Sequence, residues 1–306
     1  MSENNGNSKN KLHGLWALTN RELKKWYKAP VIFILSIIQP IIWMGLLGKA
    51  MNIGAIFSSG SFDQLMGKLV LTPPLTSTQS LQLGGFFQNL QASIMQNAFK
   101  TTDYFSFMAV GMIAFTALFT TAFSGMSVVW DRRLGFLNKA LSTPVSRGVI
   151  IFSKVLSATL RSMFQAGIII VIAIAFGLQF GASFHPLYIL GVFAMMFLVC
   201  VGLSSMFIAI TIRSTRIETP MAVMNLITLP LMFASNAFFP TNIMPSWLQT
   251  VAQFNPMTYT TDAVRQLLIY STTDFAQVAA DFAYVGIFAL VVATIGIVLS
   301  WRYLSK

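Results

Sequence analysis

The amino-acid sequence alternates between long apolar runs and shorter polar segments that carry most of the charge. Six of the apolar runs are about as long as an α-helix must be to cross ~30 Å of hydrocarbon. They cover residues 31–48, 105–130, 150–177, 187–212, 219–238 and 282–303. The pattern predicts an all-α, polytopic membrane protein with six transmembrane helices.

The N-terminal arm divides into two parts. Residues 1–10 are polar, and we expect them to be disordered. From residue 11 to residue 28, apolar side chains follow a near-heptad spacing while Arg21, Lys24, Lys25 and Lys28 interrupt them. That pattern is typical of an amphipathic helix lying in the membrane interface. The alternative is a charged anchor before the first span, and in both cases residues 11–306 form a single transmembrane domain.

The basic segment from residue 128 to residue 161 separates the second and third runs. Leu134, Leu137 and Leu141 recur at three- and four-residue steps, which places them on one helical face. Pro144 should end that helix, and Thr143 can cap a second helix that has Pro144 at its first position. A short helix followed by a hard turn suits a part that contacts something outside the membrane. The alternative is a basic loop that only fixes topology.

Two further segments contain no piece of spanning length. Residues 49–103 form a long loop of mixed polarity, in which Phe87, Leu90, Ile94 and Ala98 predict one amphipathic helix. Residues 239–281 alternate between apolar stretches and the helix-breaking Pro240, Pro245 and Pro256. We expect both segments to lie on the outer side.

The charge distribution predicts the orientation. Only 9% of the residues are charged and 55% are hydrophobic, whereas about 25% of a soluble domain is charged. Sixteen of the 20 lysine and arginine residues fall on the side of the two termini; the other four are Lys49, Lys68, Lys100 and Arg265. This asymmetry predicts a multi-pass protein of the cell membrane with both termini in the cytoplasm. The net charge of +11 therefore comes from basic residues that orient the protein in the lipid membrane, and we expect no nucleic acid as a partner.

Motifs for catalysis and metal binding are missing from the sequence. Cys200 is the only cysteine, and His13 and His185 lie far apart, so no metal-ligand spacing occurs. The sequence contains no GxxxxGK[ST] phosphate loop, no HExxH and no GxSxG. We therefore expect no enzymatic activity and no cofactor on this chain. Acidic residues are also missing from the six runs, which argues against a self-sufficient secondary carrier.

Four polar side chains fall within the apolar runs or at their ends. Gln39, Gln165, Asn225 and Asn236 are the residues concerned. Such residues commonly form hydrogen bonds between transmembrane helices, each worth about 1 kcal/mol. The alternative is that they line a substrate pathway.

Four stretches of the sequence together resemble a known family. They are Gln39-Pro40 with Trp43, residues 104–111, residues 131–147, and residues 238–265 with their Phe-Phe-Pro, Met-Pro and Phe-Asn-Pro-Met-Thr-Tyr elements. From about Trp16 to Arg302, the chain resembles the membrane subunit of ABC-2 type transporters, in the branch of daunorubicin-resistance and related export permeases. It departs from the family pattern at Asp131, where glutamate is usual, and in the length of loop 49–103.

The resemblance implies a homodimer or heterodimer of six-span subunits driven by separate cytoplasmic ABC ATPase chains, which would hold ATP and Mg²⁺. It implies an N-terminal interface helix, a cytoplasmic coupling helix between spans two and three, and outer re-entrant helices after span five. We expect the ATPase to be contacted by Asp131, Arg132, Arg133, Leu134, Leu137, Leu141 and Pro144. The leucines would fill a groove, the charged residues would lie at its rim, and the turn at Pro144 would stiffen the connection.

The function implied is ATP-driven export of a drug-like, lipid or glycan substrate. A secondary carrier and a membrane scaffold that transports nothing remain alternatives.

Overall fold

The computed structural model describes residues 4–50, 77–101, 103–143, 145–214 and 216–304, and every regular element in these ranges is a helix. The prediction of an all-α fold is confirmed for this part of the chain. The elements are α1 (Asn4–Tyr27), α2 (Pro30–Trp43), η1 (Met44–Ala50), α5 (Ser77–Ile94), η2 (Met95–Phe99), α6 (Tyr104–Arg133), α7 (Phe136–Leu141), α8 (Arg147–Ala175), α9 (Tyr188–Thr211), α10 (Glu218–Phe233), η3 (Thr241–Ile243), α11 (Ser246–Gln253), α12 (Pro256–Leu268) and α13 (Phe275–Leu304).

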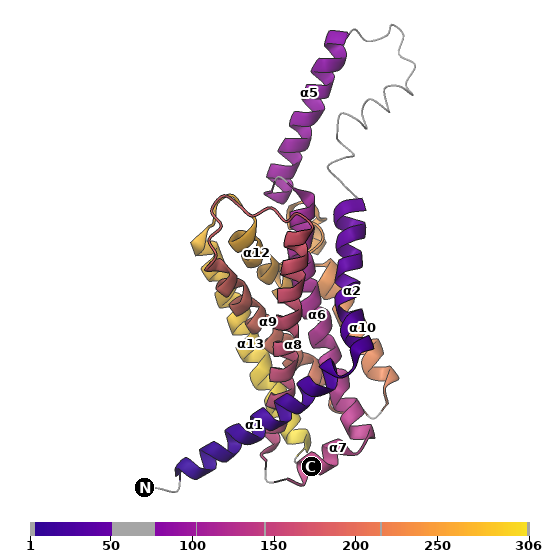
Figure 1. Cartoon of the computed structure of the whole chain (residues 1–306), viewed down its shortest axis with the longest axis vertical. Helices are drawn as coiled ribbons and strands as arrows, with labels where there is room; N and C mark the ends of the chain where they lie inside the picture. Colours follow the sequence, from indigo (N-terminus) through magenta and orange to yellow (C-terminus); the bar gives the residue numbers. More distant parts are fainter. Residues whose placement is uncertain (1–3, 51–76, 102, 144, 215, 305–306) are drawn as a thin grey trace.

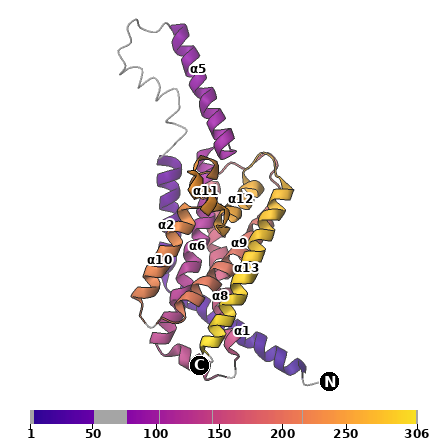
Figure 2. The same cartoon turned by 180° about the vertical axis from the view of Figure 1, so that it is seen from behind.

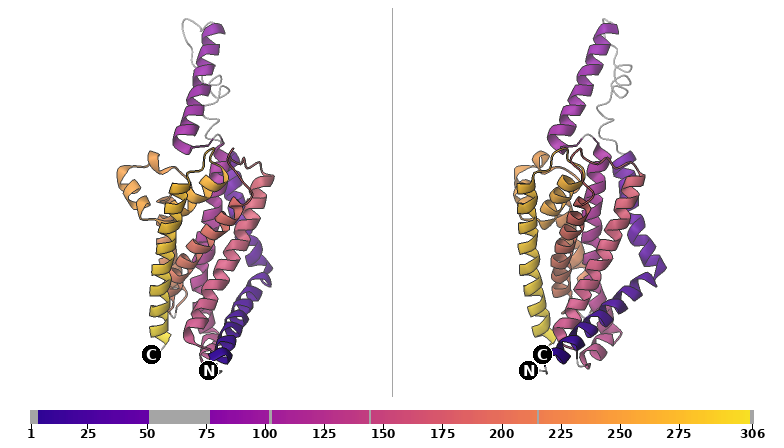
Figure 3. Two further views of the ribbon diagram at one scale, coloured as in Figure 1. Left: turned by 90° about the vertical axis from the view of Figure 1, so that its left-hand side faces the viewer. Right: turned by 60° about the vertical axis from the view of Figure 1, so that its left-hand side comes forward.

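The long helices form one upright bundle (Figure 1). Helix α9 packs against α6, α8, α12 and α13, while α2 contacts α6 and α8, and α10 contacts mainly α6. The first residues of α1 and the last residues of α13 lie at the same end, which we call the terminal end (Figures 1 and 3). Helix α5 projects from the opposite end, which we call the far end (Figure 2). The shared position of the termini agrees with an even number of crossings.

Each of the six expected spans coincides with a helix, but the helices differ in length. Among the described residues, four stretches are long and apolar enough to cross a membrane: one within Leu81–Arg133, Arg147–Ala175, Tyr188–Thr211 and Phe275–Tyr303. The first span corresponds to α2 and η1, which contain a shorter apolar helix at Phe33–Leu46. The fifth corresponds to α10, which has only 16 residues. A multi-pass membrane protein follows from these helices.

Helix α1 crosses the terminal end of the bundle at an angle and contacts α8 and α2 (Figure 1). It begins at Asn4 and includes residues 4–10, for which disorder was expected. Polarity alone does not end a helix, and residues 4–10 contain no proline that would stop one. Leu12 and Trp16 are exposed, whereas Trp26 packs edge-on against Phe33, with ring centroids 4.8 Å apart.

The loop predicted at residues 49–103 is partly helical. Residues 51–76, which include most of its first half, lie outside the described residues. The expected amphipathic helix is present as α5 followed by η2, and it begins ten residues before Phe87. Leu81 and Phe86 are exposed on α5, while Met95 and Phe99 of η2 are buried against the bundle.

The segment after α10 is folded back onto the far end by a buried arginine. The Arg265 guanidinium on α12 donates to the carbonyl oxygens of Asn236 (2.7 Å), Ala237 (2.9 Å) and Phe107 (3.2 Å). It also lies 3.4 Å from the centroid of the Phe107 ring. Hydrogen bonds and ring contact offset the cost of burying this charge. Arg265 therefore fixes α12 to the start of α6 and to the turn after α10.

Close contact between the backbone at Gly111 and the outer segment adds to this packing. A Cβ atom added at Gly111 of α6 would lie 2.1 Å from the carbonyl oxygen of Ala237. No side chain fits at that distance, so only glycine allows the outer segment to lie this close to α6.

Substitution of Gly111 should therefore lower stability. We expect Gly111→Ala to lower the midpoint of thermal unfolding in detergent, because overpacking typically costs about 1–3 kcal/mol. Gly286→Ala is the matched control, since a Cβ there meets nothing within 4 Å. Equal midpoints for the two variants would contradict the close contact.

Candidate functional site

The segment expected to form one coupling helix is divided by a glycine. Helix α6 continues to Arg133, Leu134 caps it, and Gly135 adopts a left-handed conformation with φ 71° before α7 begins. The Gly135 amide donates to the Arg132 carbonyl oxygen at 3.0 Å, and a left-handed glycine commonly ends a helix in this way. The prediction that Leu134, Leu137 and Leu141 share one helical face is therefore wrong for Leu134.

The three leucines also differ in exposure. Leu134 is 75% exposed, whereas Leu137 is 2% exposed and Leu141 is partly buried. Leu137 packs in a small core with Ala140 and Ile150, against which Leu18 of α1 also lies. Leu137 therefore holds α7 to the bundle, and the exposed side chains at this corner include those of Arg133, Leu134, Asn138 and Lys139.

The turn after α7 also differs from the expectation. Pro144 lies outside the described residues. The Thr143 hydroxyl donates back to the Ala140 carbonyl oxygen at 2.6 Å, and α8 begins at Arg147 with Ser146 as its N-cap. Thr143 thus finishes α7 and does not cap the next helix.

Asp131 lies inside the protein, although a position at an exposed rim was predicted. Its side chain is 2% exposed, and each carboxylate oxygen binds one ammonium group. Lys25 Nζ of α1 lies 2.6 Å from Oδ1, and Lys154 Nζ of α8 lies 2.6 Å from Oδ2. A carboxylate can be buried at this depth because both oxygens are paired with opposite charges.

A second carboxylate completes a group of five charged side chains. Glu22 of α1 lies 2.9 Å from Arg21, 3.2 Å from Lys25 and 3.4 Å from Lys154. We call Arg21, Glu22, Lys25, Asp131 and Lys154 the charged cluster. It joins α1, α6 and α8, and the Lys154 and Glu22 side chains at its centre are 4% and 7% exposed.

Two arginines extend these contacts to neighbouring elements. The Arg21 guanidinium lies 3.0 Å from the centroid of the Phe136 ring, which ties the cluster to α7. Arg132 donates to the carbonyl oxygens of Ile212 and, at 3.3 Å, Ser214, just after the end of α9. Cations near helix C-termini also interact favourably with the helix dipole. Arg133, by contrast, is exposed.

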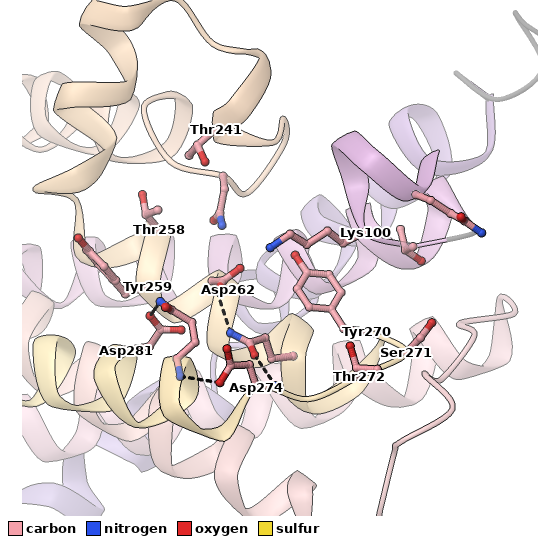
Figure 4. Close-up of a pocket in the computed structure, with 15 residues that line it drawn as sticks. Lys100, Thr241, Thr258, Tyr259, Asp262, Tyr270, Ser271, Thr272, Asp274 and Asp281 are labelled. Atoms are coloured by element: carbon pink, nitrogen blue, oxygen red, sulfur yellow. Dashed lines mark hydrogen bonds between the residues drawn. The ribbon is translucent and has the colours of Figure 1, made fainter. Parts of the chain in front are cut away.

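The candidate pathway residues fall into three places. Gln165 and Gln39 line a cavity of about 100 Å³ between α2, α6 and α8, and Gln165 binds the hydroxyls of Thr120 and Ser36. Asn236 lines a larger cleft at the far end (Figure 4). Asn225 is exposed on α10 and lines neither space. Hydrogen bonding between helices thus explains Gln165.

Sequence reasoning did not assign roles to Glu22, Lys25 or Lys154. Two signals were present: Glu22 is the only acidic residue between residues 11 and 28, and Lys154 follows the start of an apolar run. An ionisable residue in such a run requires a partner. The sequence offers several carboxylates for that purpose, and only the fold selects Glu22 and Asp131.

Comparison with known proteins gives one consistent result. The sequence profile of the family described as ABC-2 type transporter matches residues 13–269. The chain is 28% identical to a putative transport permease ycf38 of Cyanophora paradoxa, over 89% of this chain and 80% of that protein. It is 23% identical to the daunorubicin resistance ABC transporter permease protein DrrB1 of Streptomyces coeruleorubidus, over 58% of this chain and 62% of that protein. It is also 28% identical to the probable multidrug ABC transporter permease YbhR of Escherichia coli K12, over 55% and 45% respectively.

The charged cluster predicts strong coupling between its members. Lys154→Met removes the buried ammonium group that Glu22 and Asp131 share, and breaking a buried pair costs about 3–5 kcal/mol. We expect a clear fall in the midpoint of thermal unfolding for this variant. Combining it with Asp131→Asn should cost less than the sum of the single changes, because the two residues interact directly.

Lys139→Met removes an exposed lysine from α7 and serves as the control. The cluster would have no structural importance if Lys154→Met were as stable as Lys139→Met, or if the two cluster substitutions were strictly additive.

Proposed function

The chain belongs to the ABC-2 type transporter family and is a membrane transport permease, and from this we propose that it is the membrane subunit of an ATP-driven exporter. A separate ABC ATPase would bind and hydrolyse ATP with Mg²⁺. The observation that carries the proposal is the charged cluster, which joins three helices directly behind an exposed corner of the bundle. Such an arrangement suits the transfer of movement from a partner into the membrane helices.

We propose that the ATPase docks on the corner formed by Arg133, Leu134, Asn138 and Lys139. All four side chains are exposed at the terminal end, and Leu134 supplies an apolar anchor between polar neighbours. Apolar anchors surrounded by polar rims are typical of protein interfaces. Leu137 and Asp131, which were expected to touch the partner, would act from behind by holding the corner in place.

The route of movement would pass through the cluster. A push on α7 reaches Arg21 through the Phe136 ring and reaches α8 through the packing of Leu137 on Ile150. Asp131 and Lys154 connect the end of α6 to α8 at 2.6 Å. We propose that α1, α7 and the adjoining ends of α6 and α8 move as one rigid body, which displaces the long helices α6 and α8 together.

The membrane arrangement follows from the same proposal. Helices α2 with η1, α6, α8, α9, α10 and α13 would form six spans, with α11 and α12 as re-entrant helices at the outer face. Irregular backbone at membrane depth is tolerated where protein covers it, and Arg265 and Asn255 bind the carbonyl groups of this turn region. Both termini would be cytoplasmic and α5 extracellular. A second permease copy, identical or related, would complete the transporter.

The substrate class proposed is a drug-like molecule, a lipid or a glycan. The names of two relatives support the drug-like class, since one is a daunorubicin resistance permease and another a probable multidrug permease. Export is the direction that resistance permeases require.

The orientation is checked with reporters. A reporter fused after Lys306 should be cytoplasmic and one inserted at Thr78 should be external, because most basic residues lie on the side of the termini. Thr78 lies near the start of α5, at the far end. Accessibility of residue 78 from the cytoplasm alone would overturn the six-span arrangement.

The docking surface is checked by exchanging leucines for aspartate. Leu134→Asp should weaken association with the ATPase by about tenfold or more and reduce efflux, since truncating an interface anchor commonly costs ~2 kcal/mol. The protein should still insert and fold, because Leu134 is 75% exposed. Leu137→Asp should instead lower the amount of folded protein, because it buries a carboxylate in an apolar core.

Leu81→Asp is the matched control, because Leu81 is as exposed as Leu134 but lies on α5 at the far end. Both association and efflux are measured in the same cells. Unchanged association and efflux for Leu134→Asp would mean that this corner does not bind the ATPase.

A further inference from the structure

A polar cleft opens at the far end of the bundle. It has a volume of about 680 Å³ and lies between η2, α12, the start of α13 and the turn after α10. Thr258, Tyr259, Asp262 and Asp281 form one side of it, and Lys100 lies on the other with Tyr270 (Figure 4). Cavities of this size accommodate small organic molecules.

Several acceptor atoms along the cleft have no protein donor. The oxygen atoms are Asn236 Oδ1, Thr258 Oγ1 and Asp281 Oδ2. Asn236 is 7% exposed and Asp281 is fully buried, and all three residues line the cleft. Buried polar atoms are almost always hydrogen-bonded in folded proteins, so a group of unpartnered acceptors around one cavity points to a ligand that donates.

Two carboxylates give this group a negative charge. Asp281 Oδ1 accepts from Gln277 Nε2 at 2.9 Å, and Asp262 accepts from Gln266 Nε2 at 3.0 Å. Burial, and after it the neighbouring Asp262 carboxylate, raise the pKa of Asp281 to about 7. Like charges at short range favour a cation between them. Asp274 is already engaged, because it accepts from the backbone amides of Ala276 and Gln277 at the start of α13.

We propose that this cleft binds a primary ammonium group of the transported molecule, an inference that rests on the proposed transport function. An ammonium group carries three donors and no acceptor, which matches the carboxylates of Asp262 and Asp281 together with the Thr258 hydroxyl oxygen. The Tyr259 ring, stacked on Tyr284 with centroids 3.9 Å apart, borders the same side and offers a face to a cation.

A metal ion fits this side less well than an organic cation. Among the residues that the structure describes, no three His, Cys, Asp or Glu side chains come together as a metal site requires. Uncharged amide and hydroxyl oxygens complete the acceptor set instead. The ligand class is therefore an amine with a polar or amphiphilic body. Lys100, on the opposite side of the cleft, would pair with an anionic group of the same ligand.

Binding is measured on the purified full-length permease in nanodiscs, without any ATPase. Glucosamine is the cationic probe, and glucose, in which a hydroxyl replaces the ammonium group, is the neutral probe. Calorimetry or ligand-observed NMR should show at least tenfold tighter binding of glucosamine. Asp281→Asn and Asp262→Asn should each weaken glucosamine binding by about tenfold, whereas Glu218→Gln, which removes an exposed carboxylate at the terminal end, should not.

Asp262 is only partly buried, so Asp262→Asn carries the test if Asp281→Asn fails to fold. Equal binding of both probes, absent binding, or binding that both aspartate variants retain would overturn the proposal. Because no ATPase is present, such a result would leave the proposed transport function standing. Conversely, failure of the chain to associate with an ATPase would contradict that function without affecting the binding measured here.

Discussion

The ammonium group of Lys154 is buried, and its need for opposite charge fixes the terminal end of the bundle. Asp131 on α6 and Glu22 on α1 provide that charge, so a helix that crosses the bundle from outside is held to two of its long members. Two carboxylates carry more charge than one lysine can neutralise. Lys25 and Arg21 supply the additional positive charge. Arg21 in turn lies against Phe136, so α7 is attached through the same group. Removing Lys154 takes away the one buried cation of the group, while the more exposed Lys25 still contacts both carboxylates.

The far end is held together by a different kind of contact. Arg265 is buried without a carboxylate within salt-bridge distance among the described residues, and carbonyl oxygens accept from its Nη1 and Nη2 atoms instead, whereas Nε has no partner. That contact depends on Gly111, where the chain passes too close for any side chain. Asp262 and Asp281 line the cleft and accept hydrogen bonds from Gln266 and Gln277, but neither forms a salt bridge within the described part of the chain. Ion pairs hold the helices together at the terminal end, whereas the far end retains acceptor atoms that have no protein donor.

The lengths of the apolar runs predict where the helices lie, because a helix that crosses a membrane must be long and apolar. They do not predict which way Leu137 and Asp131 point. Periodicity placed the leucines on one face, but Gly135 with φ 71° ends the helix between Leu134 and Leu137. Asp131 looked like a surface charge because its partners lie far away in the sequence, at Lys25 and Lys154. Pairings of this kind depend on tertiary contacts that a local pattern does not contain.

The proposal that α1 moves with α8 as one rigid body is tested most directly by a disulfide between α1 and the turn that leads into α8. A Cβ at Gly14 would lie 3.2 Å from Val145 Cγ2, so Gly14→Cys and Val145→Cys are within reach of a bond. Cys200, the only native cysteine, is replaced by serine in this variant. ATP-driven efflux with the ATPase present should proceed at the same rate in the oxidised and reduced states. Efflux that stops on oxidation and returns on reduction would show that α1 must move relative to α8.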